Sequence, residues 1–111
     1  MGKMLYMDYA ATTPPAAEVV QKTLPWLREK FGNPSAVCQN GQEARKAVEE
    51  ARRSAAKLIG ADADEIFFTS GGTEADNWVL ERSCPHGCSS HIITSAIEHH
   101  AVINTCKALE K

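Results

Sequence analysis

The sequence lacks any hydrophobic run of the roughly 20 residues that a transmembrane helix requires. Its first residues, Met1 to Tyr6, lack the apolar core of a signal peptide. A basic tract is also missing: 12 Lys and Arg stand against 14 Asp and Glu, for a formal net charge of −2. Nucleic-acid-binding proteins concentrate positive charge against phosphates. These absences predict a cytoplasmic protein with no nucleic-acid partner and no membrane partner.

Internal repeats and low-complexity tracts are absent as well, which excludes solenoid and linker architectures. The chain has 111 residues, of which 43% are hydrophobic and 23% charged, and these are ordinary values for a globular protein. A length of this size allows one domain at most.

The cysteines are few and are not arranged as a disulfide framework, which a reducing cytosol would disfavour. Cys84 and Cys88, with His91 close behind, have a spacing compatible with zinc. A closed zinc site needs four ligands, so the favoured interpretation is a polar turn without a metal. The other two cysteines are Cys38 and Cys106.

Apolar periodicity predicts two helices in the first half of the chain. The first spans residues 16–31, with a break or kink expected at Pro25. The second ends at Gly60, a residue typical of helix C-termini, and Glu49 and Arg53 are spaced for an ion pair. Its expected apolar face consists of Ala44, Ala47, Val48, Ala51, Ala55, Leu58 and Ile59.

The second half alternates between strand-like and helix-like segments. Residues 65–69 are short, aromatic and β-branched, which predicts a buried strand, and residues 91–95 predict another. Helices are expected from Glu74 to Leu80 and from about His99 onward. This βαβ order predicts an α/β fold with a parallel sheet.

The turn between the first strand and its helix contains Gly71, Gly72 and Thr73. A helix N-terminus offers unpaired backbone N–H groups and a positive dipole end, and glycines allow a ligand to approach closely. The pattern therefore indicates a phosphate site. An ordinary glycine turn with Thr73 as the helix cap explains it equally well.

His99 and His100 follow the second strand, at the same edge of the expected sheet. A histidine there could stack on a flat cofactor or move protons. Alternatively, one histidine starts the helix and the other is solvated.

Five segments, taken together, resemble the cysteine desulfurases, which are class V aminotransferase-like enzymes that depend on pyridoxal 5′-phosphate (PLP). The segments occur in order along the whole chain: residues 8–14, 31–35, 68–77, 91–95 and 98–99.

The resemblance implies part of the large domain of a fold type I PLP-dependent transferase (aspartate aminotransferase-like), with an incomplete parallel-type sheet. Residues 1–14 would form an N-terminal segment near the substrate pocket, and residues 15–111 the N-terminal part of the PLP-binding domain. Gly72 and Thr73 would bind the cofactor phosphate. His99 would stack on its ring and assist proton transfer as a catalytic residue. The residues expected near the substrate are Ala10, Ala11 and Thr12.

The implied reaction converts L-cysteine to L-alanine and leaves the sulfur as an enzyme persulfide. That sulfur would serve a sulfur-acceptor protein in Fe–S cluster or thio-cofactor assembly, and the complete enzyme would be a homodimer. L-Selenocysteine or another class V substrate is an alternative.

In the family, the cofactor-binding lysine and the persulfide-forming cysteine lie beyond the part that this chain matches. The chain is therefore expected to be inactive alone, as an N-terminal fragment with an unfinished sheet, marginal stability and a tendency to associate. Two alternatives are one half of a split PLP enzyme completed by a second chain, and a non-catalytic domain that binds a phosphate ligand.

Overall fold

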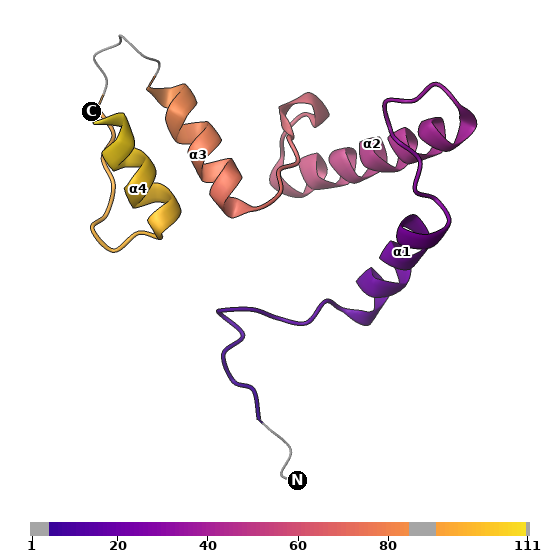
Figure 1. The fold of residues 1–111 in the computed structure, drawn as a ribbon, viewed down its shortest axis with the longest axis horizontal. Helices are drawn as coiled ribbons and strands as arrows, with labels where there is room; N and C mark the ends of the chain where they lie inside the picture. Colours follow the sequence, from indigo (N-terminus) through magenta and orange to yellow (C-terminus); the bar gives the residue numbers. More distant parts are fainter. Residues whose placement is uncertain (1–4, 85–90, 111) are drawn as a thin grey trace. The chain divides into compact units, whose positions relative to one another are not determined.

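The computed structural model describes residues 5–84 and 91–110 of the chain. They divide into two compact units, one ending at Ile66 and the other beginning at Phe67. The ribbon is drawn in Figure 1. Each unit is described by itself below.

The first helix of the first unit is α1 (Ala17–Arg28), which confirms the first predicted helix with a shorter C-terminal end. A break at Pro25 is wrong, because Pro25 lies inside α1, and the alternative of a kink there stays a prediction. Proline lacks an N–H, so it removes one helical hydrogen bond. The Pro25 carbonyl still accepts hydrogen bonds from the backbone N–H groups of Glu29 and Lys30, and the helix ends one turn after the proline.

Helix α2 (Gln39–Ile59) ends as the sequence predicts. Gly60 adopts the left-handed conformation with a φ of 71°, and its N–H donates to the Ala56 carbonyl. A Cβ at Gly60 would meet nothing within 4 Å, so the backbone angle alone explains the preference for glycine.

The predicted apolar face of α2 is only partly correct. Ala44 is buried, but Leu58 and Ile59 are 86% and 69% exposed. The Glu49–Arg53 pairing is wrong, because Glu49 pairs instead with Arg52 at 3.2 Å. The Arg52 guanidinium also donates to the Ile66 carbonyl, which ties the segment after the 3₁₀ helix η1 (Ala63–Glu65) to α2.

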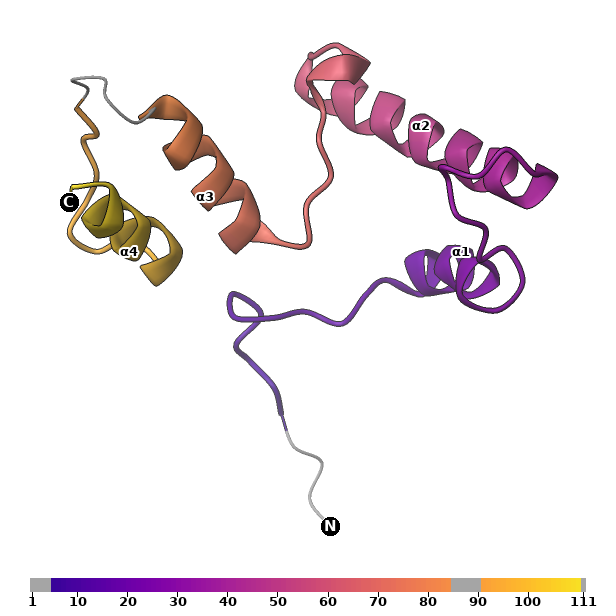
Figure 2. The ribbon, with the colours of Figure 1, turned by 45° about the horizontal axis from the view of Figure 1, so that its top comes forward.

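The second unit consists mainly of α3 (Gly72–Ser83) and α4 (His100–Leu109), which pack against each other. The half-buried side chains of Thr105 and Asn77 form a hydrogen bond between them. Each of these residues is the sixth of its helix. Figures 1 and 2 show the two helices side by side and running in the same direction, with their N-terminal ends at one end of the pair.

The strand predictions are not supported, because the described residues contain no β-strand. Ile66 has extended backbone angles, but residues 66–69 form no strand, and Phe67 and Phe68 are 65% and 54% exposed. Residues 91–95 form no strand either, and Ile93 is 98% exposed. Extended backbone becomes a strand only when a second chain segment supplies the ladder of hydrogen bonds. Aromatic and β-branched composition predicts the conformation and cannot supply that neighbour.

The buried hydrophobic residues among the described positions are three alanines, Ala44, Ala56 and Ala101. No helix in residues 5–84 or 91–110 combines the length and apolar character needed to cross a membrane. The expected boundary between residues 14 and 15 stays a prediction.

Candidate functional site

The N-terminal end of α3 is open. Gly71 is the N-cap residue in an extended conformation (φ 166°, ψ 179°), and its carbonyl accepts the first helical hydrogen bond from the Ala75 N–H at 3.2 Å. No side chain caps the helix, and a Cβ on Gly71 or Gly72 would meet nothing within 4 Å. Thr73 lies in the first turn, so the alternative that makes Thr73 the cap is wrong. The first-turn N–H groups of a helix have no partner within the helix, and such groups suit an anion.

Glu74 forms a clasp at this end of α3 that the sequence interpretation missed. Its Oε2 accepts hydrogen bonds from the Ser70 backbone N–H at 2.6 Å and from the Ser70 hydroxyl at 2.7 Å. The backbone bond, followed by the hydroxyl bond, stabilises the charged carboxylate and lowers the pKa of Glu74. The usual capping box places its acidic residue three positions after the serine. Here the spacing is four, so that pattern does not detect the clasp.

His99 is the N-cap residue of α4. Its Nδ1 accepts a hydrogen bond from the Ala101 backbone N–H at 3.1 Å. His100 is the first residue of the helix, and both side chains are exposed. The ring centroids of His99 and His100 lie 6.3 Å apart, with their planes tilted by 53°. His99 is thus the N-cap that begins the helix, and a histidine at the helix start was one of the two expectations.

The structure brings Gly72, Thr73 and His99 to the same end of the α3–α4 pair, because both helices begin there (Figure 2). The sequence interpretation placed these residues on one edge of a sheet. In the structure these residues come together because α3 and α4 run in the same direction and are joined through Asn77 and Thr105.

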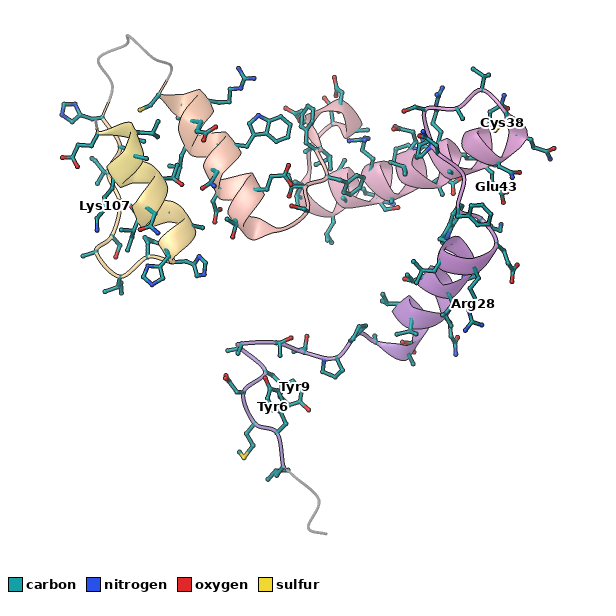
Figure 3. The ribbon with its side chains drawn as sticks, in the orientation of Figure 1. Tyr6, Tyr9, Arg28, Cys38, Glu43 and Lys107 are labelled. Atoms are coloured by element: carbon teal, nitrogen blue, oxygen red, sulfur yellow. The ribbon has the colours of Figure 1, made fainter. Side chains whose placement is uncertain are left out.

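Ala10, Ala11 and Thr12 belong to the first unit, where they form a turn on the Asp8 carbonyl. That carbonyl accepts hydrogen bonds from the Ala11 N–H at 3.1 Å and from the Tyr6 hydroxyl at 2.8 Å. The Tyr6 and Tyr9 rings, labelled in Figure 3, meet edge to face at 5.5 Å.

A hollow of about 920 Å³ lies beside α4 in the second unit. Residues with reactive or polar side chains that line it include Cys84, His91, Ser95, His100, Cys106 and Lys107. Cys88 lies outside the described residues, so the proposed Cys84–Cys88–His91 cluster is not tested as a whole. Among the residues that are described, no group of three or more His, Cys, Asp or Glu is placed to hold a metal ion.

Comparison with known proteins shows the family to which the chain belongs. The family model for aminotransferase class V matches residues 5–111. The chain belongs to the aminotransferase class-V family. It is similar to the cysteine desulfurase IscS of Dictyoglomus turgidum, with 52% identity over 100% of this chain and 29% of the relative. For the cysteine desulfurase IscS of Methanosarcina thermophila, the identity is 49% over 97% of this chain and 27% of the relative.

Among solved structures, a NifS-like protein matches with a TM-score of 0.85 and 39% identity, over 93% of this chain and 29% of that one. The resemblance to the cysteine desulfurases is therefore confirmed, and so is the fold shared with part of the NifS-like chain. The aminotransferase class-V chain spans less than a third of the length of these relatives, and it matches the N-terminal portion of the desulfurases.

Proposed function

We propose that this chain forms the phosphate-binding part of a PLP-dependent cysteine desulfurase, which takes sulfur from L-cysteine for a sulfur-acceptor protein. The observation that carries the proposal is the match over the whole chain to proteins named cysteine desulfurase, at 46–52% identity. The complete enzyme acts as a homodimer in this proposal.

The residues at the start of α3 fit the phosphate of PLP. Gly71 and Gly72 have no Cβ, and the space that a Cβ would occupy is empty to 4 Å, so a ligand can approach the backbone closely there. A dianionic phosphate is the kind of group that unpaired helix N–H groups and the positive dipole end stabilise. Thr73 adds a hydroxyl in the first turn, where it can donate to a phosphate oxygen.

The remaining roles are those that the resemblance to the cysteine desulfurases implies. PLP, when bound, supplies an electron sink for the amino-acid substrate. His99 lies at the same end of the helix pair as Thr73 and would contact the cofactor ring. Ala10, Ala11 and Thr12 would line the approach of the substrate in the proposed enzyme.

A chimera tests the function directly. It joins residues 1–111 to the remaining portion of the Dictyoglomus turgidum desulfurase, replacing the matched part of that protein. We expect the chimera to form alanine from L-cysteine and to transfer the outer sulfur of its persulfide to a thiol acceptor, which regenerates the enzyme thiol. A folded chimera that binds PLP but forms no alanine from L-cysteine would contradict the proposal. Faster turnover of L-selenocysteine than of L-cysteine would change the proposed substrate.

Thr73→Ala tests the phosphate assignment in the same chimera. Loss of one charge-assisted hydrogen bond costs about 1.5–3 kcal/mol, so the dissociation constant for PLP should rise by roughly 10-fold or more. Equilibrium dialysis of PLP measures it. Thr23→Ala is the matched control, because the Thr23 hydroxyl bonds the Val19 carbonyl within α1 of the other unit. Equal affinity in both variants would remove Thr73 from the site.

A further inference from the structure

The N-cap of α4 is made by an imidazole. Residues with short polar side chains, such as Ser, Thr, Asp and Asn, usually occupy this position. Here the His99 backbone is extended (φ −61°, ψ 149°), and its carbonyl accepts from the Val102 N–H at 2.9 Å. Its Nδ1 accepts from the Ala101 N–H at 3.1 Å. Ala101 is the second residue of the helix and is buried.

The direction of this hydrogen bond determines where the ring carries its proton. A backbone N–H can only donate, so Nδ1 must present its lone pair. A neutral imidazole has one N–H, which then resides on Nε2.

His100 provides an internal comparison. It is adjacent to His99 in sequence and is also exposed. His100 lines the hollow beside α4, whereas His99 does not. The two rings are tilted by 53° with centroids 6.3 Å apart, so they do not stack face to face. The cap hydrogen bond therefore distinguishes two otherwise similar histidines.

We infer that the α4 cap fixes the neutral ring of His99 as the Nε2–H tautomer, so that Nε2 offers its surroundings a hydrogen-bond donor. The identity of the acceptor, a group on PLP or its substrate, rests on the proposed function; the tautomer rests on the cap alone. A neutral imidazole held at a helix N-terminus is a known means of polarising a bound group.

Nitrogen-15 NMR of the histidine side chains tests the tautomer in the 111-residue chain, at pH 8, where an ordinary imidazole is neutral. His99 should show one fixed tautomer with the proton on Nε2. His100 should show shifts averaged between the two tautomers. A proton on Nδ1 of His99, or averaged shifts there, would overturn the inference. The same measurement on the chimera decides the question if the isolated chain does not form α4.

Amide hydrogen exchange at Ala101 provides the second readout. His99→Ala should accelerate it by roughly 2- to 30-fold, the range expected for loss of an N-cap. His99→Asn keeps a side-chain acceptor and should stay within about twofold of the wild type. His100→Ala is the matched control and should have little effect on the cap bond. An unchanged Ala101 exchange rate in His99→Ala would overturn the inference. A chimera without desulfurase activity would contradict the proposed function and leave the tautomer standing.

Discussion

At the scale of single residues, Glu74 links the chain before α3 to the first turn of the helix through one carboxylate oxygen. Ser70 donates both its backbone N–H and its hydroxyl to that oxygen. The clasp spans the two glycines and Thr73, which lie between Ser70 and Glu74. Glu74 thereby acts as a positioning residue for the proposed phosphate site.

The clasp should depend on pH. The backbone and hydroxyl bonds from Ser70 lower the pKa of Glu74 below its ordinary value of 4.5. Its stabilisation is therefore fully present above the unfolded pKa and is lost as the pH falls through the folded value. Ser70 amide exchange should accelerate as the pH falls below about 4.5, after correction for intrinsic rates. In Glu74→Gln this extra acceleration should disappear.

Glu81→Gln, at the other end of α3, is the matched control and should retain the pH dependence of the wild type. Identical profiles for Glu74→Gln and the wild type would show that the clasp does not form in solution.

Sequence reasoning found the residues of the candidate site but not their local bonds. The positions of Gly72, Thr73 and His99 follow from glycine content, helix periodicity and the resemblance. The Glu74 clasp escaped because its spacing differs from the capping box. A histidine at the start of this helix was one of the expectations, but the bond that its Nδ1 accepts from the Ala101 N–H was missed. Histidine is an unusual N-cap residue, and the bond depends on the ring angle, which spacing does not determine.

At the scale of elements, Gly60 is the residue that ends α2. Gly60→Ala should destabilise the last turn of α2 by about 1 kcal/mol or more, because a Cβ disfavours the left-handed backbone. Exchange of the α2 amides near Ile59 should rise roughly fivefold. Gly71→Ala is a suitable control, since its extended φ suits any residue and the added Cβ meets nothing. Equal effects of the two substitutions would refute the conformational explanation.

The hydrogen bond between Asn77 and Thr105 should couple α3 to α4. Asn77→Ala and Thr105→Val each remove it, so the double variant should lose less stability than the sum of the two single variants. The expected coupling is about 1 kcal/mol, or roughly fivefold in the exchange rates of α4 amides. Thr105→Ser keeps the hydroxyl and should remain close to the wild type. Strictly additive effects would mean that this bond does not join the helices.

The helices could be predicted because each carries its own signal: periodic apolar residues, Gly60 after α2, and the glycines at the start of α3. The strands failed as predictions because their stability depends on another segment. Residues 65–69 and 91–95 have the composition of strands, but composition cannot state whether a neighbour is present to pair with them.

At the scale of the whole molecule, the described residues bury little apolar area. The buried hydrophobic positions are alanines, while large side chains such as Leu27, Phe31 and Ile97 are 72%, 74% and 93% exposed. Small side chains contribute little transfer free energy on burial. The chain alone should therefore melt broadly, and the chimera should melt cooperatively at a higher temperature.

Circular dichroism melts of the two proteins at equal concentration measure this difference. Sedimentation velocity over a dilution series shows whether the chain associates, as its exposed apolar residues would favour. A sharp two-state transition of a monomeric chain at high dilution would contradict the prediction.

The shared direction of α3 and α4 has an electrostatic consequence. Each N-terminus carries the equivalent of roughly half a positive charge, and two such ends side by side repel each other. The Glu74 carboxylate in the first turn of α3 offsets part of this repulsion. An anion that binds there relieves the repulsion and also gains the attraction of both helices, so it stabilises the folded pair by mass action. The same positive field destabilises the packing of α3 against α4 and attracts an anion to their N-terminal ends. Anion binding and folding of the helix pair are therefore one coupled equilibrium.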